Sequence, residues 1–434
     1  MQKHIITIFS LFFFVQCNYS SHKSERDRLQ DEVVAGDTLT IITSNYKEKD
    51  DTIRVTQFID SLFYIPLEKN EECTIQDIGK VLMTNTYIFI LDNSSDLYMF
   101  RRDGSFLRRI IGECFGFDIL EQEELIYCAQ DKRNNKYIAV FDFDGKIVHK
   151  KINLSDEVYG VGNFIAAIDT GKIAVALWNT GKEDNRLEII GTDRRIIKTF
   201  PNHEKFKSAN LPQTNASRFH RMLSRRNGKI RFHPYYSDTL FAVSAETLAL
   251  NPVCVEQKIT KVPLLHRLEY LGDQKEFSRY CHENNTYTTR FFESNRYFFI
   301  IYNLGYIQQT LACYLLYDKQ TGELYNYKQQ LNFDTERLHF GIFNDYDGGL
   351  PFEPEFNSGE YLIQACKASQ FVRFYTKGRE LKDCDIHTDI CKMKHYEIKS
   401  DSWSSEERKQ VLENTIKKIK ENDNPILIVA QLKK

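Results

Sequence analysis

The sequence predicts an all-β fold, a six-bladed β-propeller with a short C-terminal amphipathic helix before the ring-closing strand. The first observation is a stretch of short strands and tight turns, Ile78 to Ile111, whose pattern recurs about every 40 to 55 residues. The second is a final apolar run, Ile426 to Leu432, that can pair with the region Ile53 to Leu67 and close the ring. The third is composition: 31 Phe and 24 Tyr against only 9 Pro in 434 residues favour a β-rich globular protein.

The clearest copy of the repeat begins the ring. Tyr87 to Leu91 is an unbroken apolar run rich in aromatic and β-branched residues, which is typical of a strand buried on both faces. Leu97 to Phe100 is a second run, and Asp103-Gly104 is a hairpin signal because Gly tolerates a positive φ. A sheet of three or four short strands is marginal alone, so neighbouring copies are expected.

Further copies follow the same order of strand, strand, turn and strand, with Asp144-Gly145 in the place of Asp103-Gly104. The segments between them, such as Gly112 to Asp118, are interpreted as loops on the faces of the ring. The predicted strands are 125–129, 137–141 and 146–152; 164–168, 173–178, 187–190 and 196–200; 229–232, 239–243 and 252–257; 297–302, 312–317 and 324–329; and 360–366 and 371–375.

A helix is predicted just before the final strand. Ser404 with Glu407 forms a capping-box signal, and apolar residues including Val411, Leu412 and Ile416 then recur on one helical face. The chain segment ends in a turn before Ile426 to Leu432, so this helix precedes the ring-closing strand.

The N-terminus predicts export. Lys3 and His4 precede an apolar run, Ile5 to Val15, that is too short to span a bilayer but suits a secretory signal; a buried first strand is the alternative. Cys17 follows one residue after this run and resembles the acylated Cys of a bacterial lipoprotein, although Gln16 departs from the small residue usual before that Cys. We therefore expect a signal peptide at 1–17, a polar tether at 18–50 and the propeller at 51–434. The protein would lie in the cell envelope, periplasmic or surface-exposed, with the lipid anchor as its only membrane contact.

The net charge argues against one class of partner, and the cysteine count argues against a dense set of disulfide bonds. The formal net charge of −2 is spread without blocks, so nucleic acid is not an expected partner. Ten Cys are present, and removing Cys17 leaves an odd number, which argues against a dense disulfide framework. Cys384 and Cys391 are the pair that oxidation could close in an exported protein.

One basic segment could bind an anionic ligand. Ser217 to Arg231 concentrates Arg side chains, whose forked donors suit carboxylates, phosphates and acidic sugars, while nearby aromatic rings could stack on sugars. The alternative is a solvated basic loop paired with acidic residues elsewhere. The candidate ligand-binding residues are Arg218, Arg221, Arg225, Arg226, Tyr235 and Tyr236.

The candidate metal site is Asp345 with Asp347, in a D-x-D-G-G loop that could present oxygen atoms to Ca²⁺. An ordinary Asp/Gly turn is the favoured alternative, because the other acidic ligands of a calcium loop are missing. A zinc site can also be drawn from Cys384, His387, Cys391 and His395, but the spacing matches no common pattern. No catalytic set can be assembled from spacing, and no cofactor is expected apart from this candidate calcium ion.

Four short motifs, in this order, resemble the uncharacterised six-bladed β-propeller lipoproteins of Gram-negative bacteria. They are Ile65-Pro66-Leu67-Glu68, Phe141-Asp142-Phe143-Asp144-Gly145, Asn344-Asp345-Tyr346-Asp347-Gly348-Gly349 and Asp423-Asn424-Pro425-Ile426-Leu427. The resemblance covers residues 50 to 434 and implies the fold and an exported location, but no activity or catalytic residues. The Gly- and Pro-rich segment usual after the first blade is replaced here by Gly112 to Asp118.

Three functions stay open at this point. The favoured one is a binding or interaction module, whose loops around a central funnel recognise a small molecule, a glycan or an envelope protein. The second is a propeller enzyme, a glycan hydrolase or lyase, with paired carboxylates or a metal in the funnel. The third is a scaffold for an envelope complex, which would expose an apolar patch on one ring face.

Overall fold

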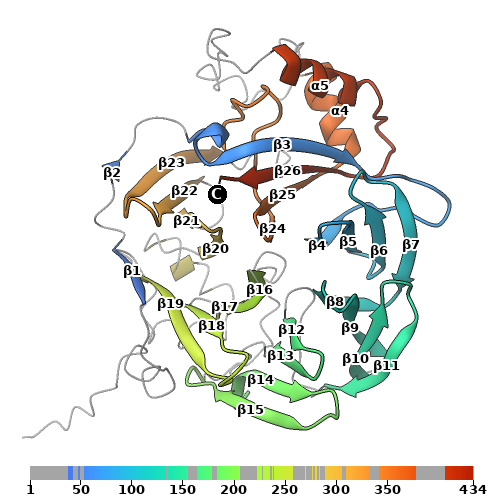
Figure 1. Cartoon of the computed structure of the whole chain (residues 1–434). Coiled ribbons are helices and arrows are strands. Elements are labelled where there is room, and N and C mark those ends of the chain that lie inside the picture. Colours follow the sequence, from blue (N-terminus) through green and yellow to red (C-terminus); the bar gives the residue numbers. More distant parts are fainter. Residues whose placement is uncertain are drawn as a thin grey trace, which may run out of the picture.

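The computed structural model confirms the six-bladed β-propeller. It describes residues 38–42, 47–48, 53–132, 135–154, 164–177, 183–205, 222–226, 228–234, 237, 239–257, 289–304, 309–332, 342–377 and 406–433, with a few single residues between 269 and 283. The blades surround one axis, and in each the first strand lies nearest that axis and the last lies outermost (Figure 1).

We number the blades in chain order. Blade 1 is β4 (Ile78–Met83), β5 (Tyr87–Asp92), β6 (Leu97–Arg101) and β7 (Phe106–Ile111); blade 2 is β8 (Cys114–Leu120), β9 (Leu125–Lys132), β10 (Asn135–Asp142) and β11 (Ile147–Asn153). Blade 3 is β12 (Ile165–Asp169), β13 (Lys172–Ala176), β14 (Asn185–Gly191) and β15 (Ile196–Pro201). Blade 4 is β16 (Leu223–Arg226), β17 (Lys229–Phe232), β18 (Thr239–Val243) and β19 (Leu250–Gln257). Blade 5 is β20 (Thr289–Glu293), β21 (Tyr297–Leu304), β22 (Gln309–Asp318) and β23 (Leu324–Asn332). Blade 6 is β24 (Phe356–Ser358), β25 (Tyr361–Cys366), β26 (Ile426–Leu432) and β3 (Ile59–Pro66).

Blade 6 closes the ring as predicted. The C-terminal strand β26 lies between β25 and β3, and its antiparallel register with β3 runs from Ile426 opposite Pro66 to Leu432 opposite Ile59. The two ends of the chain thus share one sheet. Every residue of β26 from Ile426 to Ala430 is buried, as expected for a strand packed between neighbouring blades.

Two short N-terminal strands extend the propeller beyond the boundary expected at residue 51. β1 (Leu39–Ile42) pairs in parallel with β19, and β2 (Lys47–Glu48) pairs in parallel with β23, so each covers the outer edge of a blade. Ile41 is 2% exposed and packs against Leu240 and Cys254 of blade 4. Part of the segment interpreted as a polar tether therefore belongs to the fold.

Two further predictions about secondary structure are wrong. Gly112 to Asp118 is not a loop, because Cys114–Leu120 is β8, the innermost strand of blade 2. Phe371 to Tyr375 is not a strand but part of the helix α4 (Ala368–Lys377), which buries Phe371 completely. The predicted C-terminal helix is confirmed as α5 (Glu406–Ile416), although Val411 is 58% exposed and Leu412 is the buried residue.

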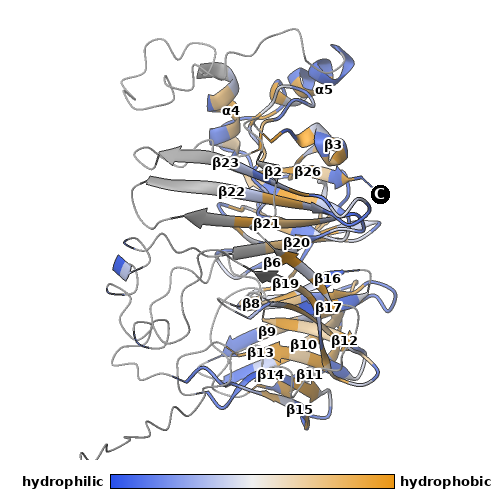
Figure 2. Ribbon diagram, turned by 90° about the vertical axis from the view of Figure 1, so that its left-hand side faces the viewer, coloured by the Kyte–Doolittle hydropathy of each residue, from blue (hydrophilic) through white to orange (hydrophobic). Residues whose placement is uncertain are grey.

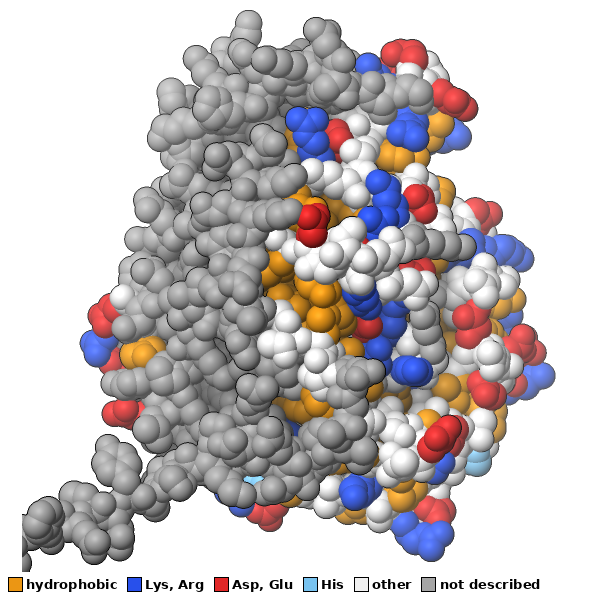
Figure 3. Space-filling model, turned by 60° about the vertical axis from the view of Figure 1, so that its left-hand side comes forward, with side chains coloured by type: hydrophobic (Ala, Val, Ile, Leu, Met, Phe, Trp, Pro, Cys, Tyr) orange, Lys and Arg blue, Asp and Glu red, His pale blue; other side chains and the backbone are white. Residues whose placement is uncertain are grey.

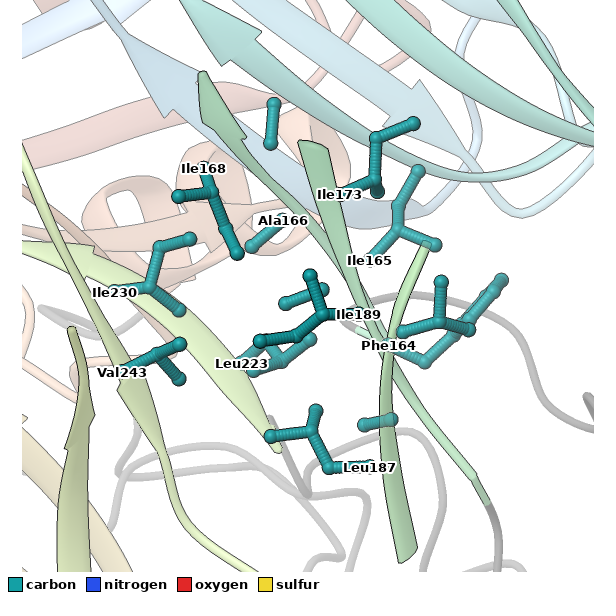
Figure 4. Close-up of a cluster of buried hydrophobic side chains, with 14 of the residues drawn as sticks. Phe164, Ile165, Ala166, Ile168, Ile173, Leu187, Ile189, Leu223, Ile230 and Val243 are labelled. Carbon is teal, nitrogen blue, oxygen red and sulfur yellow. The ribbon is translucent and has the colours of Figure 1, made fainter. Parts of the chain in front are cut away.

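The hydrophobic core lies between neighbouring blades. Figure 2 shows apolar residues (orange) concentrated in the strands of the ring, and Figure 4 shows one cluster in which side chains of blade 3 meet those of blade 4. There Ile168 and Ile189 of blade 3 lie with Leu223, Ile230 and Val243 of blade 4. Stacking thus buries both faces of each middle strand, which explains why these strands are apolar runs rather than alternating ones. Among the described helices, none is long and apolar enough to cross a membrane.

Candidate ligand-binding site at the propeller axis

Only part of the predicted site can be placed. Arg225 and Arg226 end β16, the innermost strand of blade 4. Arg218, Arg221, Tyr235 and Tyr236 lie outside the described residues, as do Cys17 and the cysteine and histidine pairs between 384 and 395.

Arg225 reaches across blade 3 to blade 2. Its Nη2 donates to Oδ2 of Asp118 (2.5 Å) in β8 and to the carbonyl oxygen of Ala167 in β12. The same Asp118 oxygen accepts the backbone N–H of Ala167 (2.9 Å). The Asp118 side chain is only 6% exposed, so this ion pair links three inner strands in a nearly dry environment.

Arg226 reaches in the opposite direction, to blades 5 and 6. Its Nη2 contacts a carboxylate oxygen of Glu360 and donates to Oδ1 of Asn295 (2.6 Å). The backbone N–H of Asn295 donates to the other Glu360 oxygen (3.3 Å). Adjacent residues of a strand point to opposite sides, which explains how two neighbouring arginines serve opposite sides of the ring.

A second ionic group lies beside Arg226. Arg231 of β17 donates through Nε and Nη2 to the two oxygens of Glu293 (2.6 and 3.2 Å), the bidentate geometry that suits a carboxylate. Lys319, just after β22, donates to Glu293 (2.9 Å) and to the carbonyl oxygen of Ser294 (2.7 Å). Glu293 ends β20, so this group joins blades 4 and 5.

Two further contacts complete a circle of polar contacts around the axis. Lys80 of β4 donates to the carbonyl oxygen of Phe117 in β8 and lies 5.0 Å from the centre of its ring. Ser358 of β24 donates to the carbonyl oxygen of Met83 (3.0 Å) and accepts its N–H (2.8 Å). Each blade is thereby joined to both neighbours through a polar contact of its innermost strands or of the residues next to them.

This axial cluster carries an excess of positive charge. Among the described residues, five cations face three carboxylates: Lys80, Arg225, Arg226, Arg231 and Lys319 against Asp118, Glu293 and Glu360. Elsewhere charge is mixed, and in the described part of the side shown in Figure 3 basic (blue) and acidic (red) side chains are interspersed. Within the described part of the chain, Nη1 of Arg226 and Nε of Arg225 are buried without a hydrogen-bond partner.

Burial and charge fix the protonation states of this cluster. Burial alone would raise the pKa of Glu293, but the hydrogen bond and charge of Arg231, together with Lys319, outweigh it and hold that pKa below its usual value of 4.5. Burial lowers the pKa of Arg226, and the charge of Arg231 adds to this while Glu293 opposes it. Glu293 is thus a carboxylate at neutral pH, and the site presents fixed charges.

The predicted calcium ligands make internal contacts. Asp345 accepts the N–H of Thr56 (3.1 Å) and its hydroxyl (2.5 Å). Asp347 accepts hydrogen bonds from Tyr64 (3.1 Å), Asn344 (2.9 Å) and the N–H of Gly349 (2.9 Å), and burial raises its pKa despite these donors. In the described part of the chain, no group of three or more His, Cys, Asp or Glu residues is placed to hold a metal ion. The loop therefore anchors residues 342–352 to the ring-closing region.

Several axial residues were not predicted from the sequence. Asp118 lies in a segment interpreted as a loop, Glu293 and Asn295 lie just before the predicted strand 297–302, and Glu360 is the first residue of the predicted strand 360–366. A usable signal was present, since Asp118 stands inside the apolar segment Cys114–Leu120 and Glu293 ends Thr289–Glu293. A charged residue in a buried strand needs an ionic or hydrogen-bonding partner, so these two positions indicate a buried polar site at the innermost strands.

The fold and the axial cluster define a six-bladed β-propeller whose inner strands carry an ionic centre. The chain belongs to the family described as "Domain of unknown function (DUF4934)", which matches residues 38–431. A crystal structure described as a "Putative exported protein" from Bacteroides fragilis is similar over 91% of this chain and 100% of its own, with a TM-score of 0.63 and 15% identity. That likeness shows the fold.

Other solved structures are less similar. The N-terminal domain of Nup159 matches over 74% of this chain and 76% of its own with a TM-score of 0.35 and 9% identity. A chain of a nidogen/laminin complex matches over 39% of this chain and 64% of its own with a TM-score of 0.27 and 12% identity. A comparison with curated proteins found no match.

Proposed function

We propose that this protein is an exported, lipid-anchored binding module whose axial cluster holds a carboxylate or phosphate group of its ligand. The observation that carries this proposal is Arg226, whose side chain is 4% exposed and whose Nη1 has no hydrogen-bond partner among the described residues. A buried donor left unpaired costs about 1 to 3 kcal/mol, and more when it is charged. An anionic group of the ligand would accept a hydrogen bond from Nη1 of Arg226 and would balance the excess positive charge of the axial cluster.

The chemistry of the cluster selects the class of ligand. Guanidinium groups bind carboxylates and phosphates through paired N–H donors, and Nη1 of Arg226 and Nε of Arg225 are the donors still available. The contacts to Asp118, Asn295 and Glu360 hold both guanidinium groups in place before the ligand arrives. Such preorganisation reduces the entropy lost on binding. Acidic sugars of envelope glycans and small organic acids are the ligands that fit.

The same cluster favours binding over the enzyme alternative. A glycan hydrolase needs one carboxyl group with a raised pKa to donate a proton. The pKa of Glu293 is lowered instead, and Asp118 and Glu360 are each engaged by an arginine. These three carboxylates act in this proposal as counter-charges that position the arginines.

The location is part of the proposal. The basic end and the short apolar run before Cys17 support export, and a protein of similar fold is described as exported. Acylation of Cys17 would hold the chain at a membrane surface. Metabolic labelling with a lipid precursor should mark the wild-type protein and not Cys17→Ala; equal labelling of both would contradict the anchor.

Calorimetric titration tests the ligand class. The panel is phosphate, glucuronate and a dicarboxylic acid, with glucose as the neutral control. We expect the acidic compounds to bind with an affinity that falls as salt is raised, and glucose not to bind. Arg226→Gln should abolish binding and Arg226→Lys should weaken it, whereas Arg195→Gln, in the exposed pair of Arg195 with Asp193, should bind as wild type does. Thermal melts confirm that each variant is folded. A panel in which nothing binds, or in which Arg226→Gln binds normally, would refute the proposal.

A further inference from the structure

The outer strands of several blades carry a β-bulge directly after the preceding turn. The register shifts between Phe106 and Arg108 in β7, between Ile147 and His149 in β11 and between Ile196 and Lys198 in β15. At a bulge two consecutive residues oppose one residue of the partner strand, and their side chains are re-aimed. In blades 2 and 3 both of these residues are aliphatic: Ile147 with Val148, and Ile196 with Ile197.

These four aliphatic side chains are exposed. Ile147 and Val148 are 52% and 48% exposed, and Ile196 and Ile197 are 59% and 45% exposed. The equivalent Phe106 of blade 1 is partly covered, since its ring lies 5.7 Å from that of Phe100. The outer edges of blades 4 and 5 are covered by β1 and β2. Blades 2 and 3 therefore each present a pair of exposed aliphatic groups, whereas the outer strand of blade 6 exposes the single side chain of Phe63 (42%).

Basic side chains surround these aliphatic pairs. Lys146, His149 and Lys151 on blade 2 and Arg194 and Lys198 on blade 3 are exposed. Nε of Arg194 donates to the carbonyl oxygen of Lys151 (3.2 Å), so the two outer edges lie side by side. We call this surface the rim patch; it consists of Lys146, Ile147, Val148, His149, Lys151, Arg194, Ile196, Ile197 and Lys198.

Two acidic side chains of the described turns beside the rim patch are paired with arginines outside it. Asp144 lies 3.5 Å from Arg108, and Asp193 lies 2.5 Å from Arg195. The rim patch thus offers cations together with exposed aliphatic groups. This combination suits a surface that is negatively charged outside and apolar beneath, which is the property of a membrane containing anionic lipids.

We propose that the rim patch docks on an anionic lipid surface. Ile147, Val148, Ile196 and Ile197 enter the region between headgroups and acyl chains, and the basic side chains bind lipid phosphates. Addition of a partner strand is disfavoured because the bulges interrupt both edges and Pro201, at the end of β15, has no N–H to donate. Pairing with a second copy is disfavoured because two basic surfaces would repel each other.

This inference rests on the proposed membrane location and extends it beyond the lipid anchor. β1, the first described strand, lies on the outer edge of blade 4, next to blade 3 in the ring (Figure 1). A tether that joins the ring at β1 would hold the side of the ring that carries the rim patch toward the membrane. The propeller would stand on its rim, with its axis parallel to the bilayer.

Vesicle co-sedimentation tests the inference with an unacylated chain that begins at Asn18, which keeps every described residue. We expect binding to vesicles of phosphatidylglycerol and phosphatidylethanolamine, weaker binding at high salt, and no binding to phosphatidylcholine alone. Ile147→Glu with Ile196→Glu should weaken binding about tenfold or more. The matched control is Val411→Glu, because Val411 on α5 is 58% exposed, as Ile196 is, but lies outside the rim patch.

Three outcomes would overturn the inference: no binding to the anionic vesicles, equal binding by the double variant, or equal loss in Val411→Glu. Arg226→Gln separates the two proposed sites. If that variant loses vesicle binding while the double variant keeps it, lipid headgroups bind at the axis and the rim patch has no role. Because the chain tested lacks Cys17, the result does not depend on whether Cys17 is acylated.

Discussion

Two equivalent glycines allow the ring closure to be tested. Gly104 and Gly145 occupy the same turn in blades 1 and 2, with φ of 89° and 81°, and each donates its N–H across the turn over 3.0 Å. A Cβ on Gly104 would lie 2.1 Å from the carbonyl oxygen of Pro66, at the end of β3. A Cβ on Gly145 would have Cδ of Arg108 as its nearest neighbour, at 4.0 Å. The two turns therefore differ in their contact with blade 6.

The expected magnitudes follow from these distances. Both Gly104→Ala and Gly145→Ala place a Cβ at positive φ, which costs about 1 to 2 kcal/mol. Gly104→Ala also forces backbone to move where Glu68 N–H donates to the Gly104 carbonyl oxygen (2.9 Å), and overpacking of this kind costs about 1 to 3 kcal/mol more. We expect Gly104→Ala to lose about 2 to 5 kcal/mol of unfolding free energy and Gly145→Ala about 1 to 2 kcal/mol.

Urea unfolding followed by tryptophan fluorescence and by circular dichroism measures both variants against wild type. The larger loss should belong to Gly104→Ala, with an unchanged slope against urea concentration if the unfolded state is unaffected. Equal losses in the two variants would show that the seam between β3 and the turn of blade 1 does not have the close contact described here. A larger loss in Gly145→Ala would refute the reasoning outright.

Other predictions follow from buried groups. Asp118→Ala leaves Arg225 without its carboxylate and should lower the urea midpoint by an amount equivalent to about 2 to 4 kcal/mol; an unchanged midpoint would contradict the axial ion pair. Because the pKa of Glu293 is lowered below 4.5, its stabilising effect is complete above pH 4.5 and is lost as the pH falls through the lowered value. Glu293→Gln should therefore differ most from wild type near neutral pH, and a difference that grows in acid would be inconsistent with this. Burial raises the pKa of Cys73 and of Cys366 to about 12, so iodoacetamide should leave both unlabelled in the native protein, as peptide mass spectrometry can check.

The repeated part of the fold could be predicted because its signals are local. The apolar middle strands and the Asp-Gly turns occur within each blade, and the apolar run Ile426–Leu432 needed one distant partner, β3. The innermost strands could not be predicted in this way. β8 contains Gly116 and Asp118 and β16 ends in two arginines, so the sequence of each strand resembles a loop. Only the contacts at the axis explain why these residues lie in strands.

Elements that depend on a neighbouring surface were also missed. β1 and β2 are strands because they pair with the outer edges of β19 and β23, which no local pattern reveals. In α4 the run Phe371 to Tyr375 has the residue types of a strand, but Phe371 and Tyr375 are also four residues apart and meet at 4.9 Å on one helical face.

The axial cluster shows why site residues are harder to predict than folds. Asp118 and Arg225 are separated by 107 residues, and Arg226 and Asn295 by 69. The basic segment predicted from the sequence, Ser217 to Arg231, contains three residues of the cluster, Arg225, Arg226 and Arg231, because Arg is rare in buried strands and therefore conspicuous. The carboxylates that accompany them come from three different blades and become neighbours only when the ring closes.

A crystal soaked in selenate tests the central claim, that the axial cluster binds an anion through Arg226. Selenate is a tetrahedral dianion that stands in for phosphate, and its anomalous signal locates it without ambiguity. We expect a peak within hydrogen-bonding distance of Nη1 of Arg226 that is absent from crystals of Arg226→Gln. Selenate found only on the outer surface, with Nη1 of Arg226 bonded to water or to protein, would contradict the account.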